Sequence, residues 1–473
     1  MKKVKIAIIG AGTAGLSARR EVEKVTNDYL IFDGGPIGTT CARVGCMPSK
    51  VLIQVANNYE SRSYFDIQGI TGQENLQINT TQVMSHVRKL RDRFVNAVNN
   101  DIKLWQHKLV QENVIFLNKN TLQTSTGETY FAEKIIIATG SKPLIPAMWS
   151  KYSDYLITTD NFFELKALPK KMVVIGLGVI GIELGQALSR LGIEVQLVGL
   201  GKGIGGVTDP IIQDYIAKKF TEQLKISYDG AKIIGVKDNQ LEVEIGGKVE
   251  LFDKGLVAIG RVPNINTLNL AILGINHPDY SSTTYQLKNY KNIYFVGDCN
   301  KQRPLLHEAA DQGRIAGYNA VRDENTCFRK RCSLGITFSD PNIAVVGQSY
   351  KDLVEKNIDF VVGKVSFEGQ GRSIVKLKEQ GLLHVYVDKI SAKLLGCELQ
   401  APDGEHLAHL LSWAISNNMR VQEVLTMPFY HPVIEEGVRT ALRDAHKQLQ
   451  QKEDSIELQR CKELFRCEDT PIR

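Results

Sequence analysis

The sequence of 473 residues predicts an α/β protein in which two similar strand–turn–helix–strand units precede a smaller α+β C-terminal domain. Each unit opens with a short apolar run that ends in a glycine-rich turn of the spacing G-x-G-x-x-G. Beyond residue 332, strand-like and helix-like patterns are mixed. Because a turn of this spacing between a strand and a helix is typical of Rossmann-like dinucleotide-binding domains, the sequence predicts two such domains.

The first unit has the features of a dinucleotide site. Its first strand is predicted over Val4–Ile9, and a second strand over Tyr29–Phe32 ends at Asp33. Glycines in the turn permit a tight bend and close approach of a pyrophosphate, while the helix start offers backbone amides to the phosphates. The Asp33 carboxylate is expected to accept a hydrogen bond from a ribose hydroxyl. The glycines of this turn are Gly10, Gly12 and Gly15.

The chain between the two units is predicted to contain two long helices and two strands. Helical periodicity covers residues 49–61 and 81–107, and strands are expected at 114–117 and 134–138. The Gly- and Pro-containing stretch that starts at residue 139 is interpreted as a turn and linker.

The second unit repeats the first but lacks its acidic residue. The second glycine turn follows a strand expected at 172–175 and opens a helix that ends near residue 191. The next strand is expected at 194–198. The position equivalent to Asp33 is Gly199, and no Arg takes its place, although Lys202 is close. We expect a dinucleotide here, with the choice between NAD and NADP left open. The glycines of this turn are Gly176, Gly178 and Gly181.

The rest of the chain completes the first domain and forms the C-terminal one. Strands are expected at 256–259, 292–296, 343–346 and 383–387, and helices at 406–417 and 436–451. The expected domains are residues 1–147 and 148–266 for the two nucleotide-binding domains, 267–334 for a central part that completes the first, and 335–473 for the C-terminal domain.

The composition argues against nucleic acids and membranes as partners. The chain has 58 basic and 52 acidic side chains, a net charge of +6, and no dominant basic block. No apolar run approaches the roughly 18 residues of a membrane span. The N-terminal apolar stretch is too short for a signal peptide. A soluble, cytoplasmic protein is expected.

Two cysteines follow the first unit, in Cys41-Ala-Arg-Val-Gly-Cys46. Their spacing, without a second pair or nearby histidines, argues against zinc, so no metal is expected. Pro48 suits the first turn of a helix, which places Cys46 at a helix N-terminus, where the pKa of a thiol falls. Five helical residues rise about 7.5 Å, more than the roughly 4.4–6.8 Å between the Cα atoms of a disulfide. The segment must therefore be distorted at Gly45 if the thiols form a redox pair; two unrelated buried thiols are the alternative.

The other cysteines are interpreted as inert. Eight cysteines in 473 residues are too sparse for a secreted disulfide framework. Cys461 and Cys467 are six residues apart and would point to different faces of a helix, which argues against a second redox relay. The remaining four occur singly, at Cys299, Cys327, Cys332 and Cys397.

A histidine near the C-terminus is the candidate base for thiol chemistry. Thiols hold their protons at neutral pH, so oxidation of a dithiol needs a base. His431 is chosen because Glu435 and Glu436 follow closely and can orient an imidazole ring. From these residues alone, an ordinary surface histidine near a helix start remains the alternative.

Together these residues resemble the flavin disulfide reductases with two nucleotide-binding domains, the class I pyridine nucleotide-disulfide oxidoreductases, and among them the dihydrolipoamide dehydrogenases. The resemblance extends from Gly10 to Glu436 and implies that the C-terminal domain is a dimerisation domain. The motifs, in the family's order, are the Gly10 turn, Cys41-x4-Cys46-Met-Pro-Ser-Lys50, Ala138-Thr-Gly140, the Gly176 turn with Glu183, Gly260-Arg-Val-Pro-Asn264, Gly297-Asp298 and His431-Pro-x3-Glu436.

The resemblance implies FAD in the first domain and NAD in the second, with NADP not excluded. Cys46 would be the thiol that faces the flavin, and Cys41 the interchange thiol that attacks a substrate disulfide. Lys50 would lie beside the flavin and pair with Glu183, and Asp298 would hold the ribityl chain. The other residues assigned to cofactor binding are Thr40, Gly140, Gly260, Arg261, Gly297, His307 and Ala309.

The resemblance also implies a homodimer in which His431, oriented by Glu436, acts as base at the other subunit's redox pair. The implied reaction is oxidation of dihydrolipoamide, free or on a lipoyl-bearing subunit of a 2-oxo acid dehydrogenase, with NAD. The sequence around His307 resembles the Leu-Ala-His-x-Ala of that branch. The alternatives are an NAD(P)H-dependent reductase of another disulfide, similar to glutathione reductase, and a non-catalytic flavoprotein scaffold. The non-catalytic scaffold is disfavoured because the residues that the resemblance assigns to redox chemistry are all present: Cys41, Cys46, Lys50, Glu183, His431 and Glu436.

Two other members of the family are disfavoured. Mercuric reductase is expected to carry an N-terminal metal-binding module and a vicinal pair of C-terminal cysteines, and neither is present. Soluble transhydrogenase lacks the full cysteine pair. Three positions depart from the family's pattern: Thr39 replaces a glycine, Arg43 an asparagine and Gly199 an acid. We hypothesise that Arg43 favours a nearby thiolate and changes the redox potential.

Overall fold

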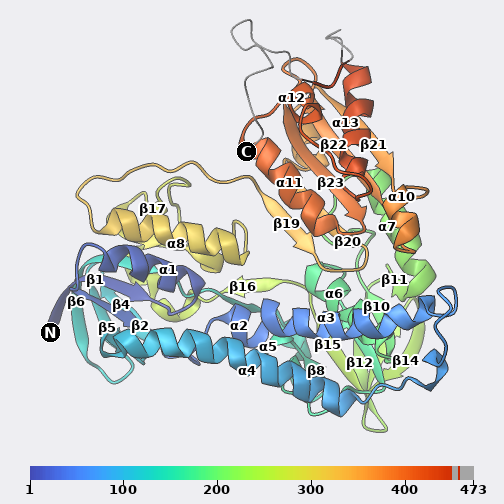
Figure 1. Cartoon of the computed structure of the whole chain (residues 1–473). Helices are drawn as coiled ribbons and strands as arrows, with labels where there is room; N and C mark the ends of the chain where they lie inside the picture. The colour runs from blue at the N-terminus through green and yellow to red at the C-terminus, as the bar shows by residue number, and fades with distance from the viewer. Residues whose placement is uncertain (450–455, 459–473) are drawn as a thin grey trace, which may run out of the picture. The chain divides into compact units, whose positions relative to one another are not determined.

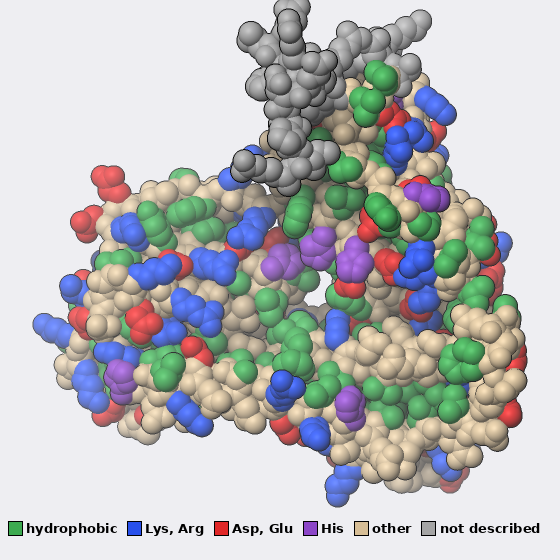
Figure 2. Space-filling model, viewed as in Figure 1, with side chains coloured by type: hydrophobic (Ala, Val, Ile, Leu, Met, Phe, Trp, Pro, Cys, Tyr) green, Lys and Arg blue, Asp and Glu red, His purple; other side chains and the backbone are tan. Residues whose placement is uncertain are grey.

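The computed structural model describes residues 1–449 and 456–458, which form two compact units (Figure 1). The first unit consists of residues 1–176, 184–199 and 229–330, and the second of residues 177–183, 200–228 and the described residues from 331 onward. Cys461 and Cys467 lie outside the described residues. Every helix within residues 1–449 and 456–458 is too short or too polar to cross a membrane. On the face shown in Figure 2, acidic and basic side chains are interspersed within each unit.

A mixed sheet that is parallel at its centre precedes and follows the first glycine turn. Strand β1 (Lys2–Ile9) pairs in parallel with β2 (Tyr29–Phe32) on one side and with β6 (Thr129–Ile137) on the other. Strand β18 (Tyr290–Phe295) pairs in parallel with β6, so the segment after residue 267 completes this sheet. The other strands of the sheet are β3 (Leu109–Val110), β4 (Val114–Asn118), β5 (Thr121–Thr124) and β17 (Gln286–Leu287).

Helices α1 (Thr13–Glu23) and α8 (Leu306–Ala320) lie side by side in this unit (Figure 1). A Cβ atom on Gly313 would lie 2.1 Å from the backbone oxygen of Ala14, and one on Gly317 would lie 2.4 Å from that of Ala18. Only glycine permits this approach, which brings the middle of α8 to the start of α1. Helices α3 (Cys46–Glu60) and α4 (Thr80–Trp105) cover the segments predicted as helical, and α3 begins three residues earlier than expected.

The second glycine turn belongs to a smaller parallel sheet. Strands β10 (Glu194–Val198), β9 (Lys171–Ile175), β15 (Lys254–Val257) and β8 (Leu156–Ile157) lie side by side in that order, and α6 (Val179–Arg190) follows β9. An antiparallel meander adjoins it in the sequence, formed by β12 (Lys232–Lys237), β13 (Gln240–Ile245) and β14 (Lys248–Phe252). The stretch interpreted as a linker forms β7 (Ser141–Pro143), which pairs with β16 (Arg261–Pro263).

An antiparallel sheet in the second unit separates an apolar core from a polar face. Its strands are β19 (Leu334–Thr337), β20 (Asn342–Gly347), β23 (Leu394–Ala401), β22 (Leu382–Asp388) and β21 (Phe360–Ser366), in that order. Leu383, Val385 and Val387 share one core with α11 (Gly404–Ser416) and α13 (Glu436–Gln448). Since side chains alternate along a strand, His384 and Tyr386 face the other way. The shorter helices of this unit are α9 (Tyr350–Glu355), α10 (Gly371–Val375) and α12 (Val421–Leu425).

A buried carboxylate on this polar face fixes the segment that leads into α7 (Pro210–Gln223). Glu398 is fully buried and accepts hydrogen bonds from Thr208 N and Oγ1 (both 2.6 Å), from Asp209 N (2.8 Å) and from Tyr350 N (2.9 Å). The Asp209 carboxylate caps α7 and lies 2.7 Å from His384 Nδ1. Burial raises the pKa of Asp209, but the hydrogen bonds from His384, Ile212 N and Tyr386, together with the charge of His384, outweigh burial and hold this pKa below its usual value. The network therefore anchors the N-terminus of α7 to the sheet.

Replacing Glu398 with Ala should destabilise the second unit by about 3–5 kcal/mol. The reason is that the groups of Thr208, Asp209 and Tyr350 that donate to this carboxylate would lose their charged acceptor. Urea denaturation followed by far-UV circular dichroism measures the loss. The exposed Glu355, at the end of α9, provides a control. Glu355→Ala should change stability by less than about 0.5 kcal/mol. Equal stability of Glu398→Ala and the wild type would contradict the anchoring role.

Candidate functional site

The two glycine turns have the same local geometry. Gly10 has φ +108°, and a Cβ atom on it would lie 2.4 Å from the backbone oxygen of Ala138. Gly176 has φ +118°, and a Cβ atom on it would lie 2.3 Å from the backbone oxygen of Ala258. Both positions therefore require glycine, for backbone conformation and for space. A Cβ atom on Gly15 would lie only 1.9 Å from the oxygen of Gly10, so α1 can lie close to the turn only without a side chain there.

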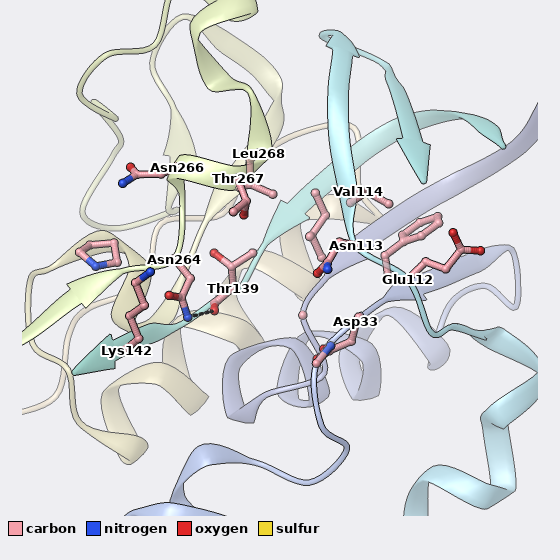
Figure 3. A pocket seen from close by; sticks show the side chains of 16 residues that line it. Asp33, Glu112, Asn113, Val114, Thr139, Lys142, Asn264, Asn266, Thr267 and Leu268 are labelled. Carbon is pink, nitrogen blue, oxygen red and sulfur yellow. Dashed lines mark hydrogen bonds between the residues drawn. The ribbon is translucent and has the colours of Figure 1, made fainter. Parts of the chain in front are cut away.

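A cavity of about 280 Å³ opens beside the first turn (Figure 3). It is lined by Gly10, Asp33, Thr139 and Asn264, among others, and the Nδ2 atom of Asn264 donates to the backbone oxygen of Thr139 over 3.2 Å. A Cβ atom on Gly12 would meet no protein atom within 4 Å, so the backbone at the start of α1 is open to a ligand. This cradle fits the pyrophosphate and ribose of a dinucleotide such as FAD.

The Asp33 carboxylate lies at this cavity in a fixed orientation. Its Oδ2 atom accepts from Ala11 N (2.6 Å) and its Oδ1 atom from Gly35 N (2.8 Å). Each carboxylate oxygen can accept more than one hydrogen bond. The residue therefore ties β2 to the glycine turn and retains capacity for a ribose hydroxyl.

Three motifs that are far apart in the sequence meet at Ser141. Its hydroxyl donates to Asp298 Oδ2 (2.9 Å) and accepts from Arg261 Nε (2.8 Å), while Arg261 Nη2 donates to the Ser141 backbone oxygen (2.7 Å). Asp298 is thereby oriented by a side chain that the sequence interpretation did not assign to the site. The only signal was the place of Ser141 directly after Ala138-Thr-Gly140.

The remaining predicted cofactor residues lie at turns or helix starts. Gly297 has φ +78° and lies near Ala309, which is buried in the first turn of α8, whereas His307 is exposed there. Thr40 is the first residue of α2 (Thr40–Val44). Gly140 and Gly260 have positive φ angles of +69° and +117° and flank β7 and β16. Their contacts with a cofactor stay predictions.

The two cysteines lie on consecutive helices that are separated by a sharp break. Cys41 is on α2, Gly45 breaks the chain with φ −124° and ψ −120°, and Cys46 is the first residue of α3. A Cβ atom on Gly45 would lie 3.1 Å from the Cα atom of Cys41, so a small residue is needed at the break. The predicted distortion at Gly45 and the helix N-terminus at Cys46 are both confirmed.

The two thiols interact directly. A side-chain hydrogen bond with Cys46, together with burial, raises the pKa of the Cys41 thiol. The Lys50 ammonium group, one turn into α3, acts in the opposite direction and favours the Cys41 thiolate. The pair therefore consists of two interacting thiols with a nearby cation that favours the charged form of sulfur.

Two residues that depart from the family's pattern, Thr39 and Arg43, hold the segment around Cys41 in place. The Thr39 side chain caps α2 by accepting from Ala42 N over 3.2 Å. Arg43 donates through Nε to the backbone oxygen of Gly38 over 3.1 Å, and its aliphatic carbons lie against this glycine. Both side chains thus fix the helix that carries Cys41 to the loop before it.

Replacing Arg43 with Asn should lower the midpoint potential of the cysteine pair by up to about 20 mV, because loss of a nearby positive charge disfavours thiolate. Equilibration of the pair with dihydrolipoamide and lipoamide mixtures measures this potential. Arg93→Gln, an exposed change on α4, removes the same charge elsewhere. An unchanged potential in Arg43→Asn would rule the hypothesis out.

The second turn and Glu183 are placed by their own contacts. A Cβ atom on Gly178 would meet no protein atom within 4 Å, as at Gly12, and Gly181 is buried in the first turn of α6. Glu183 Oε1 accepts from Phe338 N over 2.9 Å. Lys50 and Glu183 belong to different units, so their pairing stays a prediction.

The candidate base is oriented by its predicted carboxylate. His431 Nδ1 lies 3.0 and 3.1 Å from the two oxygens of Glu436, and Val433 N donates to Glu436 Oε2 over 3.2 Å. The hydrogen bond with His431 lowers the pKa of Glu436. The His431 side chain is 80% exposed, so its Nε2 edge is accessible from outside this chain.

An apolar groove of about 530 Å³ adjoins His431 in the second unit. It is lined by residues of α11 and of the segment between α12 and His431. Four of its side chains are large, apolar and exposed: Leu410 (38%), Trp413 (69%), Met427 (40%) and Tyr430 (80%). Contiguous exposed apolar surface of this kind is typical of a protein–protein contact.

The cysteines outside this segment include two that are buried, Cys299 and Cys397. Burial raises the pKa of Cys299 to about 12, and burial also raises the pKa of Cys397. Cys327 is exposed. Within residues 1–449 and 456–458, no group of three or more His, Cys, Asp or Glu side chains could hold a metal ion.

Comparison with known proteins gives matches over more than 90% of this chain. A dihydrolipoyl dehydrogenase of Bacillus subtilis is 27% identical over 91% of this chain and 93% of its own length. A mercuric reductase of Staphylococcus aureus is 25% identical over 92% of this chain and 81% of its own length. The structure of RclA, an HOCl-induced flavoprotein disulfide reductase of Escherichia coli in its Cu(II) complex, has a TM-score of 0.80 at 19% identity. The aligned region covers 95% of this chain and 100% of the RclA chain.

Family assignment rests on two matches within the chain. Residues 334–442 match the dimerisation domain of the pyridine nucleotide-disulphide oxidoreductases. Residues 4–313, more than half of the chain, match the main part of these enzymes. The match includes both glycine turns and both cysteines, so the chain belongs to the pyridine nucleotide-disulphide oxidoreductase family.

Proposed function

We propose that this chain is a homodimeric flavoenzyme that oxidises dihydrolipoamide to lipoamide with NAD, with Cys41 and Cys46 as its redox pair. The observation that carries the proposal is the pair of hydrogen-bonded thiols on α2 and at the start of α3, with Lys50 favouring the thiolate. Dihydrolipoyl dehydrogenases among the relatives match over 91–93% of this chain, which supports the choice of substrate.

The two glycine turns supply sites for two dinucleotides. The first turn, Asp33 and the Ser141-linked Asp298 would hold FAD, and the second turn would hold the nicotinamide dinucleotide. Bound FAD would supply two-electron transfer between the cysteine pair and the nicotinamide. In the overall reaction, dihydrolipoamide and NAD⁺ give lipoamide, NADH and one proton.

The cysteines carry out the exchange of thiols and disulfide. One substrate thiolate attacks the Cys41 sulfur of the oxidised pair, which forms a mixed disulfide and releases the Cys46 thiolate. The second substrate thiolate attacks the substrate sulfur of the mixed disulfide, which closes lipoamide and releases the Cys41 thiolate. Lys50 stabilises the thiolate so produced, because its charge acts against the rise in the pKa of Cys41 that the hydrogen bond with Cys46 and burial cause.

His431 accepts the protons that the substrate thiols lose. Glu436 holds the imidazole through Nδ1, which leaves Nε2 to act as the base. We place His431 at the redox pair of the other subunit, because it is exposed and adjoins the apolar groove that a second copy would cover. A lipoyl-bearing subunit of a 2-oxo acid dehydrogenase is the proposed macromolecular partner, and the cytoplasm the proposed location.

A second candidate is an NAD(P)H-dependent reductase of another low-molecular-weight disulfide. It is favoured by Gly199, which supplies no carboxylate for the 2′-hydroxyl of NAD. Mercuric reductases also match at an identity similar to that of the dehydrogenases.

Steady-state kinetics with several substrates separates the two candidates. The values of kcat/KM are compared for dihydrolipoamide with NAD, and for lipoamide and glutathione disulfide with NADH and NADPH. We expect lipoamide to be preferred over glutathione disulfide by at least about 100-fold, since glutathione carries charged groups that a lipoamide site does not pair. A preference for glutathione disulfide would move the function to the second candidate.

A further inference from the structure

The second glycine turn is held by a different group from the first. In the first turn, the residue between the leading glycines is Ala11, whose N–H donates to the Asp33 carboxylate over 2.6 Å. After β10 the position of that carboxylate is taken by Gly199, which has no side chain. Here Gly205 N donates over 3.1 Å to the backbone oxygen of Leu177, the residue between the leading glycines of the second turn. A backbone group thus holds the second turn where a carboxylate holds the first.

This hydrogen bond orients a peptide group at the open side of the turn. The C=O and N–H of a trans peptide point in opposite directions. Because Leu177 O points toward Gly205, the N–H of Gly178 points away from it. A Cβ atom on Gly178 would meet no protein atom within 4 Å. Since the second glycine of such a turn lets the backbone approach a pyrophosphate, the position of Gly205 determines how this peptide group meets a dinucleotide.

Gly205 is itself held by the C-terminal sheet. The buried hydroxyl of Thr337, at the end of β19, donates to Gly205 O over 3.3 Å. Gly205 has φ +63°, and a Cβ atom on it would lie 3.0 Å from Ile343 Cδ1 on β20. The next residue, Phe338, donates through its N–H to Glu183 Oε1 on α6 over 2.9 Å. The end of β19 therefore contacts both the loop of residues 200–208 and the helix that follows the turn.

The same face of the sheet holds the far end of this loop. Thr337 pairs with Ile343 and Ile343 with Gln400, so these side chains share a face with Glu398, two residues before Gln400. Glu398 accepts hydrogen bonds from the N–H and the hydroxyl of Thr208, both over 2.6 Å. The loop is thus fixed at two points, Gly205 and Thr208, by side chains of one sheet.

We propose that Thr337 is a positioning residue for the nicotinamide dinucleotide. Through Gly205 it fixes the peptide between Leu177 and Gly178, and so sets the affinity of the second turn for the coenzyme. The inference rests on the proposed function only in placing a nicotinamide dinucleotide at this turn. Because Thr337 is buried and acts through the loop, its loss should weaken coenzyme binding and leave the rate of the bound complex unchanged. The second anchor, at Glu398, keeps the loop attached to the sheet.

Coenzyme binding to the oxidised, FAD-loaded protein tests this without a disulfide substrate. Calorimetry measures the Kd of NAD and of NADP, and the coenzyme that the wild type binds more tightly is compared across variants. Thr337→Val removes the donor and keeps the shape of the side chain, so Kd should rise about three- to tenfold. Thr337→Ser restores a hydroxyl and should return Kd to within about twofold of the wild type.

A kinetic readout separates positioning from chemistry. Ferricyanide accepts electrons from the reduced flavin, so reduction of ferricyanide by NADH or NADPH follows coenzyme oxidation alone. In Thr337→Val the KM for the reduced coenzyme should rise in parallel with Kd, while kcat stays unchanged. A fall in kcat with wild-type Kd and KM would overturn the proposal.

Two further variants distinguish this role from a general loss of stability. Ser339→Ala removes another buried hydroxyl of the same segment, which donates to the backbone oxygen of Pro341 over 2.7 Å. Its Kd should equal that of the wild type. Thr208→Val removes one of the hydrogen bonds that Glu398 accepts and should raise Kd about two- to fivefold. This variant carries the test by itself if Thr337→Val does not fold.

Wild-type Kd in both Thr337→Val and Thr208→Val would overturn the proposal, as would an equal rise of Kd in Ser339→Ala. Absence of binding of either coenzyme by the wild type would also overturn it. Failure of the proposed function has a different signature. In that case dihydrolipoamide and lipoamide would not react, while the pattern of coenzyme binding across the variants would persist.

Discussion

Replacing Cys41 with Ser should reduce turnover of dihydrolipoamide with NAD by more than about 10³-fold, because a hydroxyl can neither form nor exchange a disulfide. Cys41 on α2 and Cys46 at the start of α3 share a hydrogen bond. Steady-state assays of the purified variant measure the loss. The visible absorbance per chain shows whether FAD is retained.

The matched control for this substitution is Cys327→Ser. Cys327 is exposed and its thiol has no role in the proposed chemistry, so the variant should keep wild-type turnover. Substantial turnover by Cys41→Ser with a full FAD content would exclude the cysteine pair as the route of electrons. The flavin site would then be intact, and another group would have to carry the electrons.

Replacing His431 with Gln should reduce kcat for dihydrolipoamide by about 10²–10⁴-fold, the usual contribution of a general base. The reason is that glutamine cannot accept the thiol proton, although it can still donate to Glu436. Because the imidazole must be neutral to accept a proton, the wild-type rate should fall as pH decreases. The variant should lose this acid limb of the pH profile.

Two further variants test the orienting contact of the base. Glu436→Gln should lower kcat less than His431→Gln, since it removes the charge that holds the ring but leaves the base. His406→Gln, an exposed change on α11, should leave the pH profile unaltered. An unchanged acid limb in His431→Gln would show that another group takes the proton.

Much of the fold could be predicted because the two glycine turns dictate their surroundings. Gly10 and Gly176 occupy positive-φ positions with no room for a Cβ atom, so the motif specifies strand, turn and helix together. The break at Gly45 was also predictable, since a regular helix cannot bring Cys41 and Cys46 within disulfide range.

The unpredicted features depend on contacts between distant segments. Ser141 became a site residue only because β7 pairs with β16, which brings Arg261 to its hydroxyl. The buried Glu398 gives no sequence signal, since its donors at Thr208 and Tyr350 are far away in the chain. The capping role of Thr39 was likewise hidden, because the family's pattern has a glycine there.

Anaerobic reduction of the purified, FAD-loaded protein by dihydrolipoamide, followed by addition of NAD, tests the central claim most directly. The visible spectrum is recorded after each addition. We expect one equivalent of dihydrolipoamide to reduce the protein, with long-wavelength absorbance appearing, and NAD then to yield about one equivalent of NADH, since the cysteine pair holds two electrons. No reduction by dihydrolipoamide, together with reduction by NADPH, would contradict the proposed substrate and leave only the family and its redox pair.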